Sequence, residues 1–376
     1  MLRICVVFGT RPEGIKVAPV VAELAHRRVP HLVVATAQHR KLLDDVLRVL
    51  PMRVDYDLDI MKESQSPNDV ASAVIEKLGT ILKKEKPDMV LVQGDTTSTL
   101  ASALASYYAN IPIGHIEAGL RTYDLSRPYP EEGNRRMVSQ IATLHFAPTN
   151  LAKENLLHER IPEEKIIVTG NTVIDALLST ASRLKNDGPL CHSIEKNCEW
   201  LKREGRMILV TVHRRESFGE PLRNIFTAFR QIVQKFDDVF IVYPVHPNPN
   251  VRTAANEILK NVKKIFLVEP LDYASFILNM MRSYLILTDS GGIQEEAPSL
   301  KKPVLVLRDL TERPEAVEAG CAKVIGTDTE RIFSETQKLL NDSVEHSKMA
   351  SGSNPFGDGK ASERIINTIE KWFKDK

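Results

Sequence analysis

Short apolar runs alternate along the chain with longer stretches in which apolar residues recur at helical spacing. Uninterrupted apolar runs separated by helices are typical of parallel strands that are buried on both faces. The pattern therefore predicts an α/β protein built from doubly wound parallel sheets. The runs lie at residues 4–8, 32–36, 89–93, 111–116, 145–147 and 166–169, and then at residues 207–212, 239–245, 264–268, 284–288, 304–307 and 323–325.

A polar, charged stretch at residues 183–206 separates the two series of strands and contains the domain boundary region. The strand–helix–strand pattern of residues 89–117 resembles that of residues 284–308. This suggests two Rossmann-like domains that face each other, with strand-end loops lining one central cleft. We assign residues 1–170 to an N-terminal domain and residues 171–359 to a C-terminal domain. A final amphipathic helix at residues 360–376 is expected to pack back on the first domain.

Composition agrees with two ordinary cores and gives no sign of a polyanionic partner. The chain has 376 residues, of which 43% are hydrophobic, and is too long for one compact core. Fifty basic and 49 acidic residues leave a net charge of +1. No basic field is present to attract nucleic acid or anionic lipid, so we expect neither as a partner.

The cysteines and the N-terminal sequence predict a cytoplasmic protein. Four scattered cysteines form no CxxC pair and fit no common zinc pattern, so we expect ordinary thiols in a reducing compartment. The first apolar run is a strand and not a signal peptide, and no segment approaches the length needed to cross a membrane.

The stretch that follows the strand at residues 284–288 predicts an anion site. Asp289 and Ser290 precede Gly291 and Gly292, and a helix then begins. The glycines allow close approach of a ligand to the backbone, and the first helical amides point at it unpaired. Glu296 lies about one turn on, where a carboxylate can accept from two neighbouring sugar hydroxyls, so the stretch suits a nucleotide. The alternative is a tight turn capped by Ser290.

Three loops in the first half of the chain carry charged groups at strand ends. Arg11 and Lys16 follow Gly9 and suit a phosphate, although a solvated loop with an incidental ion pair explains them equally well. Asp95 follows Gly94, where capping of the next helix is the simpler interpretation. Glu117 ends an apolar strand, where a carboxylate gains nothing structurally unless it is paired or used.

Two further segments add acid, base and cationic groups. Pro130 is well placed at a helix start, and Glu131 complements its positive end. Glu131 and Arg135 are spaced for an i,i+4 pair, so a surface helix is the alternative. In the second half, His213 precedes two arginines close to Gly219, which suggests a clamp for a pyrophosphate.

These motifs, taken in order, resemble the non-hydrolysing UDP-N-acetylglucosamine 2-epimerases over nearly the whole chain. The resemblance implies a GT-B-type fold, interconversion of UDP-GlcNAc and UDP-ManNAc, no metal or nicotinamide cofactor, and a homodimer. It rests on Gly9-Thr10-Arg11-Pro12-Glu13, Gly94-Asp95-Thr96-Thr97, Glu117-Ala118-Gly119-Leu120-Arg121-Thr122, Pro130-Glu131-Glu132, His213-Arg214-Arg215-Glu216 and the stretch from Asp289 to Arg313-Pro314-Glu315.

The resemblance also implies roles for single residues. Asp95, Glu117 and Glu131 would transfer protons, without a decision on which acts on which face of the sugar. His213 would assist the leaving phosphate. Arg11, Lys16 and Arg135 would stabilise anionic groups. In the nucleotide pocket, Phe276 would contact the base, although by itself it suggests a core aromatic. Ser290, Gly291 and Gly292 would hold the phosphates, Glu296 the ribose diol, and Arg313 and Leu271 would lie nearby.

A second, regulatory UDP-GlcNAc site, found in many family members, is expected to be altered here. The resemblance places it at Gln38, His39 and His246, but Lys41 and Ser64 replace a glutamine and an arginine of the family pattern. We therefore expect weakened or altered activation by substrate. Other functions that stay open are C2 epimerisation of a related sugar such as a UDP-diacetamido uronic acid, a GT-B glycosyltransferase, and a UDP-sugar sensor without catalysis.

Overall fold

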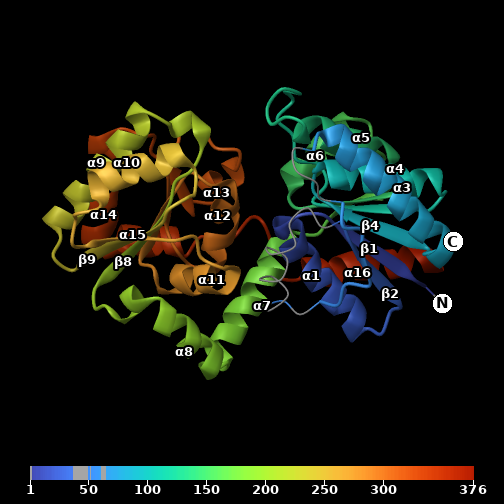
Figure 1. Ribbon diagram of the computed structural model, residues 1–376, viewed down its shortest axis with the longest axis horizontal. Coiled ribbons are helices and arrows are strands. Elements are labelled where there is room, and N and C mark those ends of the chain that lie inside the picture. Colours follow the sequence, from blue (N-terminus) through green and yellow to red (C-terminus); the bar gives the residue numbers. More distant parts are fainter. Residues whose placement is uncertain (1, 37–49, 51, 61–64) are drawn as a thin grey trace. The chain divides into compact units, whose positions relative to one another are not determined.

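The computed structural model describes residues 2–36, 50, 52–60 and 65–376. The chain divides into two compact units, Met1–Ala176 with Phe356–Lys376, and Leu177–Pro355, which we call unit 1 and unit 2 (Figure 1). Each unit is built on one parallel sheet with helices on its faces. The predicted α/β class with two doubly wound, Rossmann-like domains is therefore confirmed.

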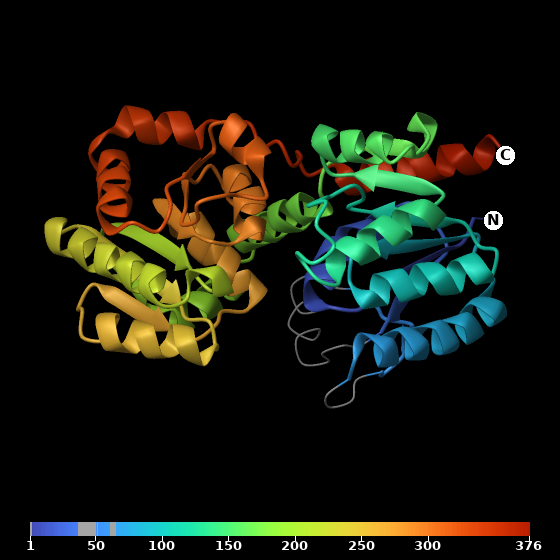
Figure 2. The ribbon, with the colours of Figure 1, turned by 90° about the horizontal axis from the view of Figure 1, so that it is seen from above.

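Unit 1 contains a seven-stranded sheet in the order β3-β2-β1-β4-β5-β6-β7, and every neighbouring pair is parallel. Helices α3, α4 and α5 cover one face, and α1 and α16 lie side by side on the other (Figures 1 and 2). The strands are β1 (Ile4–Phe8), β2 (His31–Ala35), β3 (Tyr56–Asp57), β4 (Met89–Gln93), β5 (Ile113–Ile116), β6 (Leu144–Ala147) and β7 (Ile166–Val168). The helices are α1 (Arg11–His26), α3 (Pro67–Glu85), α4 (Thr97–Tyr108), α5 (Glu131–Ile141), α6 (Asn150–His158), the start of α7 (Thr172–Asn186) and α16 (Ala361–Lys374).

Unit 2 contains a six-stranded sheet in the order β10-β9-β8-β11-β12-β13, again parallel throughout. Helix α9 packs between α10 and α14. The strands are β8 (Arg206–Thr211), β9 (Val239–Pro244), β10 (Ile265–Val268), β11 (Leu285–Thr288), β12 (Val304–Val306) and β13 (Ala322–Val324). The helices are α8 (Gly188–Asn197), α9 (Glu220–Lys235), α10 (Pro249–Leu259), α11 (Tyr273–Arg282), α12 (Gly291–Glu296), α13 (Pro314–Glu318), α14 (Thr329–Asn341) and α15 (Ser343–Ala350).

The apolar runs form the centre of each sheet because they are buried on both faces. All residues of β1 and β4 are buried, as are those of β11. Among the strands in the described residues, the apolar pattern did not predict β3, in which Tyr56 and Asp57 pair with β2 at the sheet edge. A two-residue edge strand has one partner and no apolar run, so its sequence carries no strand signal.

The strand order reverses once in each sheet, and charged loops follow the two strands on either side of the reversal. In unit 1 it falls between β1 and β4, whose carboxyl ends lead to Gly9 and Gly94. In unit 2 it falls between β8 and β11, which lead to His213 and Asp289. Open α/β sheets bind ligands at such reversals, outside the carboxyl ends of the strands. The topology therefore brings the predicted motifs of each half to one place.

The C-terminal helix belongs to unit 1 and is tied to it by polar contacts. Asp175, in α7, accepts hydrogen bonds from the first backbone N–H groups of α16, at Ala361 (3.2 Å) and Ser362 (2.8 Å). Arg27, at the end of α1, donates to Asn367 at 2.6 Å. The apolar stripe of α16 is buried at Ile365, Ile366 and Ile369.

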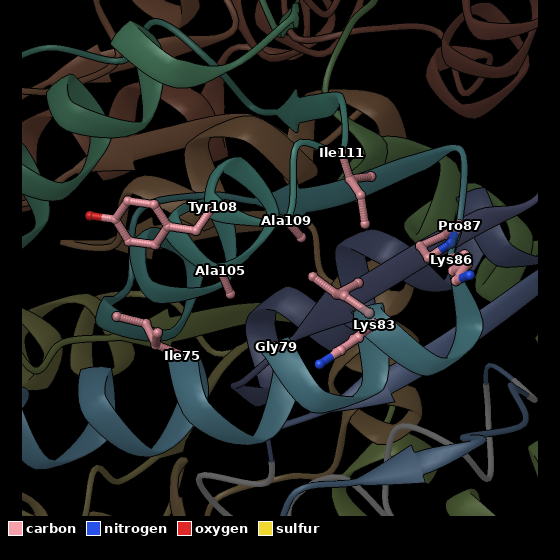
Figure 3. Close-up of a pocket in the computed structure, with 10 residues that line it drawn as sticks. Ile75, Gly79, Lys83, Lys86, Pro87, Ala105, Tyr108, Ala109 and Ile111 are labelled. Carbon is pink, nitrogen blue, oxygen red and sulfur yellow. The ribbon is translucent and has the colours of Figure 1, made fainter.

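A pocket of about 530 Å³ lies between α3 and α4 of unit 1 (Figure 3). It is lined by Ile75, Gly79, Leu82, Lys83, Lys86, Pro87, Ala105, Tyr108, Ala109 and Ile111. Pro87 and Ile111 precede β4 and β5, so the pocket lies at the amino edge of the sheet. The predicted catalytic loops lie at the opposite, carboxyl edge. None of the helices in the described ranges is long and apolar enough to cross a membrane.

Two histidines are buried side by side in the sheet of unit 1. His115 in β5 pairs with His145 in β6, and both are fully buried. The Nε2 atom of His115 lies 2.7 Å from the carbonyl oxygen of Gly94, so the neutral ring with a proton on Nε2 suits it. Burial lowers the pKa of His115 to about 4 and that of His145 to about 3. Both rings are therefore neutral in the folded protein at neutral pH.

We predict that His145→Leu makes the protein less sensitive to acid. As the pH falls below about 6.5 the unfolded chain protonates His145, whereas the folded protein does so only near 3, so wild-type stability is lost as the pH falls through this window. The variant should lose up to about 3 kcal/mol less than wild type between pH 6.5 and 4. Urea unfolding followed by circular dichroism at several pH values measures the difference.

His26→Leu is the matched control, because the His26 side chain is 83% exposed. It should follow the wild-type pH dependence. Equal acid sensitivity of wild type and His145→Leu would contradict the prediction.

Candidate active site

Glu117 is a carboxylate at the carboxyl edge of the unit 1 sheet that a cation and two amides contact. It follows β5 with a left-handed φ of 64°, a strained conformation for a residue with a side chain. Lys16 in α1 contacts its two carboxylate oxygens at 2.6 and 2.7 Å. Asn171 donates to Oε1 at 3.0 Å, and Gln93, the last residue of β4, donates to Oε2. The donors compensate for burying a charge that is only 7% exposed.

Asp95 lies in the neighbouring loop and has a different environment. Its carboxylate forms an ion pair with Arg135 of α5 at 2.8 Å. Burial raises the pKa of Asp95 to about 6; the charge of Arg135 opposes this shift, and the charge of Glu117 adds to it. Asp95 therefore gains and loses a proton close to neutral pH, as a group that transfers protons must.

Glu131 and Arg11 complete the predicted set in unit 1. Glu131 is half-buried at the first position of α5, and its charge also raises the pKa of Asp95. Asn134, in the same helix, donates to the backbone carbonyl of Asp95 at 2.9 Å, which fixes the helix to the loop. Arg11 is the half-buried first residue of α1. The structure thus groups Asp95, Glu117, Lys16 and Arg135, with Glu131 near enough to act on Asp95.

Several charged residues of the same motifs serve the fold. Glu13 accepts from the backbone N–H groups of Gly9 (2.5 Å) and Thr10 (2.8 Å) and from the hydroxyls of Thr96 (2.5 Å) and Thr99 (3.0 Å), so its carboxylate ties α1 to the Asp95 loop.

Arg121 and Glu132 act in the same way. The guanidinium of Arg121 pairs with both oxygens of Glu159 at 2.8 Å. Glu132 is fully buried and accepts from the backbone of Thr122 (3.0 Å) and Tyr123 (3.1 Å). Residue type alone does not distinguish these carboxylates from Glu117.

In unit 2, His213 is held by Asp289, which the sequence analysis did not select as a site residue. The fully buried Asp289 accepts through Oδ2 from the backbone N–H of His213 (2.7 Å) and Arg214 (2.8 Å). Its Oδ1 lies 3.3 Å from Nδ1 of the His213 ring. Burial lowers the pKa of His213, and the Asp289 carboxylate opposes that shift. The available signal was a carboxylate directly after a buried strand, the same signal that selected Glu117.

The start of α12 forms a cationic concavity. Ser290 stands at its N-cap but makes no side-chain capping hydrogen bond, so the capped-turn alternative is wrong. A Cβ placed on Gly291 would lie 3.8 Å from the guanidinium of Arg313 and 4.0 Å from that of Arg214. Arg313 is oriented by Glu295 and by the carbonyl oxygen of Glu312 at 2.9 Å. The first amides of a helix and two guanidinium groups together suit a phosphate.

The other predicted nucleotide contacts also lie in unit 2. Phe276 is half-buried, whereas its neighbours on α11, Ser275 and Ile277, are buried, so it is not the core residue that its sequence alone suggests. Leu271 is half-buried in the loop before α11. Glu296 ends α12 and is 8% exposed.

The predicted regulatory residues are only partly within the described chain. Gln38 and His39, with the divergent Lys41 and Ser64, lie outside the described residues, so altered activation by substrate stays a prediction. The ring of His246 stacks on that of His213, with centroids 5.3 Å apart. Among the residues that the structure describes, no three His, Cys, Asp or Glu side chains are arranged to hold a metal ion.

Two parallel-sheet domains with charged loops at their strand-order reversals define the GT-B-type class of α/β enzymes. The family model for UDP-N-acetylglucosamine 2-epimerase matches residues 22–370. The UDP-N-acetylglucosamine 2-epimerase of Salmonella typhimurium is 49% identical over 374 residues, covering 99% of this chain and 99% of that protein. The Escherichia coli K12 protein of the same name is 48% identical over 372 residues, covering 98% of each.

A solved structure shows the same fold. The UDP-GlcNAc 2-epimerase of Neisseria meningitidis, crystallised with UDP-GlcNAc bound, has a TM-score of 0.91 and 47% identity, covering 98% of this chain and 100% of that one. The chain belongs to the UDP-N-acetylglucosamine 2-epimerase family, whose members are isomerases.

We predict that Asp289→Asn lowers the pKa of His213 further. The amide oxygen can still accept from the two backbone N–H groups, but the negative charge that favours the protonated ring is lost. The pKa of His213 should therefore fall below its wild-type value. NMR titration of the histidine ring carbons measures it.

Asp328→Asn is the control, since Asp328 caps α14 through Arg331 N and asparagine caps equally well. It should leave the pKa of His213 unchanged. A pKa of His213 that stays constant or rises in Asp289→Asn would contradict the prediction.

Proposed function

We propose that the protein interconverts UDP-GlcNAc and UDP-ManNAc by eliminating UDP to a glycal-type intermediate and adding it back. Family membership supports the reaction, and the Neisseria relative was solved with UDP-GlcNAc bound. Two observations in this chain carry the proposal: unit 1 contains an acid–base cluster with Asp95 and Glu117, and unit 2 contains an anion cradle at Gly291. The relatives favour this sugar over the related uronic acid and over glycosyl transfer.

The reaction needs both parts because the proton at C2 of the sugar is not adjacent to a carbonyl group. Direct removal of that proton is very unfavourable. Departure of UDP from C1 builds positive charge there, which acidifies the C2 proton. Inversion then requires a proton to leave from one face and return on the other, so at least two acid or base groups must flank the ring. The departing pyrophosphate requires cations and hydrogen-bond donors.

In our proposal unit 2 holds UDP. The hydroxyl of Ser290 and the backbone N–H groups of Gly291 and Gly292 bind the phosphates together with Arg313, and Arg214 contributes a second guanidinium. Glu296 accepts from the ribose hydroxyls, and the half-buried ring of Phe276 contacts the base, with Leu271 beside it.

His213 assists the leaving phosphate. Burial keeps its ring neutral in the free protein, and the charge of an incoming pyrophosphate favours the protonated form. In the protonated form His213 can donate a hydrogen bond to the departing oxygen.

Unit 1 carries the proton chemistry. Asp95 changes its protonation state near neutral pH and is suited to hold or release a proton during turnover. Glu117 is surrounded by donors that favour an ionised carboxylate, so it acts as the proton acceptor, and Glu131 supplements the pair. Arg11, Lys16 and Arg135 stabilise the negative charge of the substrate and of the carboxylates.

Incubation with UDP-GlcNAc in D2O tests this function. We expect NMR to show a manno-configured product with deuterium at C2. Asp95→Asn should lower kcat by about 10²-fold or more, because the amide cannot transfer the proton. Asp124→Asn, an exposed acid in the loop before α5, should retain activity. A wild-type protein that yields neither deuterium at C2 nor the product would end the proposal.

The state of the cysteines supports a proposal for the cellular compartment in which the protein works. All four, Cys5, Cys191, Cys198 and Cys321, are free thiols. Free thiols are usual in a reducing compartment, so we propose that the protein works in the cytoplasm.

We also propose that the protein forms a homodimer through α3 and α4 of unit 1. Tyr107 and Tyr108, at the end of α4, are 56% and 73% exposed and adjoin the 530 Å³ pocket of Figure 3. Exposed aromatic side chains beside an apolar pocket are typical of protein interfaces. An interface at the amino edge of the sheet leaves the catalytic loops at the carboxyl edge uncovered.

Tyr108→Glu should weaken this dimer by placing a charge at its centre. Sedimentation equilibrium should show a dimer for wild type and a shift of at least about tenfold in the dimer Kd for the variant. Val344→Glu, at a residue of α15 that is 74% exposed, should behave as wild type. A monomeric wild type, or an unaffected variant, would contradict the proposed interface.

A further inference from the structure

Asn171 is a buried amide that contacts a proposed catalytic group. It lies between β7 and α7 and is 2% exposed. Its Nδ2 donates to Oε1 of Glu117 at 3.0 Å, while its Oδ1 accepts from the backbone N–H of Val173 at 3.1 Å. The second bond settles the orientation of the amide, because a rotated amide would place its NH2 group against an N–H donor and its oxygen against a carboxylate.

The chain leaves unit 1 after Ala176 and returns to it at Phe356. The backbone at Asn171 is hydrogen-bonded to the returning segment. The Asn171 N–H donates to the carbonyl oxygen of Phe356 at 2.7 Å. A Cβ on Gly170, which has a φ of 88°, would lie only 3.2 Å from Cα of Gly357. The close approach requires a glycine here. Asn171 is therefore held from both segments, independently of Glu117.

Glu117 needs more than a cation to be aligned. Lys16 touches both of its oxygens, but an ammonium on a flexible stem acts as a point charge and does not set the carboxylate plane. Gln93 on Oε2 and Asn171 on Oε1 are planar donors that bind opposite oxygens. Two such donors restrict rotation of the carboxylate, and proton transfer depends on that orientation.

We propose that Asn171 is a positioning residue for the epimerisation: its amide aligns the Glu117 carboxylate for proton transfer at C2. The inference rests on the proposed function and adds a residue to it. Gln93 of β4 also orients the Glu117 carboxylate. Asn171 is the better residue to substitute, because backbone contacts hold its position and a substitution leaves them in place.

Asn171→Asp tests the inference with an isosteric change. The remaining oxygen still accepts from Val173 N, but the atom facing Glu117 becomes an acceptor. We expect kcat to fall by about 10²-fold. The KM for UDP-GlcNAc should change by less than about twofold, because the proposed UDP contacts lie in unit 2.

The pH dependence separates positioning from damage to the fold. The groups that interact with Glu117 include Lys16 from α1, Gln93 from β4, the charge of Asp95 and the buried His115 ring of β5. Asn171→Asp adds a new carboxylate to them. As the pH falls, this carboxylate and that of Glu117 share one proton and regain a hydrogen bond. The ratio of variant to wild-type kcat should therefore rise as the pH is lowered.

Asn171→Ser provides the second variant. Its hydroxyl can cap Val173 N, but it does not reach Glu117 with an amide, so kcat should fall by about tenfold with no recovery at low pH. Asn186→Asp makes the same chemical change at the exposed end of α7 and should retain wild-type kcat. Circular dichroism and calorimetric binding of UDP should match wild type in all three variants.

The outcomes separate the two proposals. An inactive wild type would overturn the proposed function. An active wild type together with wild-type kcat in Asn171→Asp and Asn171→Ser would overturn the inference, and so would parallel losses of kcat and UDP affinity. If Asn171→Asp does not fold, Asn171→Ser tests the inference alone. A lower kcat with unchanged KM supports it, and a wild-type kcat overturns it.

Discussion

The burial of a carboxylate at the end of an apolar strand is the constraint on which both domains depend. Removing such a charge from water is unfavourable unless cations and N–H groups surround it. Glu117 meets this requirement through Lys16, Gln93 and Asn171, which come from three separate segments. In unit 2, Asp289 meets it through the backbone N–H groups after β8. The hydrogen-bond donors around each buried carboxylate are therefore held close to it, and they include Lys16 and His213, to which the proposed mechanism gives roles.

The donors around these two carboxylates differ from the surroundings of Asp95. Asp95 has one ion pair and shares its surroundings with other negative charges, so burial dominates and its pKa rises to about 6. Glu117 has a cation and two amides. Two carboxylates in one loop cluster thus have different donors around them, and of the two it is Asp95 whose pKa burial raises.

Much of the fold was predictable because parallel strands buried on both faces are continuous apolar runs, as in β1 and β11. The exception, β3, has no such run. The candidate site was less predictable. Glu13 and Glu117 stand in similar motifs, yet Glu13 binds the donors of its own loop and serves the fold. Asn171 and Asp289 were missed, since an asparagine or aspartate beside a helix start suggests a cap.

The sequence by itself determined the class of the fold, the family, and the loops that carry charge, because these depend on local periodicity and on motifs contiguous in the chain. Only the tertiary structure decided which charged residues meet. Asn171 lies 54 positions from Glu117, and Lys16 lies 101 positions from it. Strand order and burial bring such residues together and shift the pKa of Asp95 and His213. Neither the strand order nor the burial of a residue can be predicted from the residues next to it in the sequence.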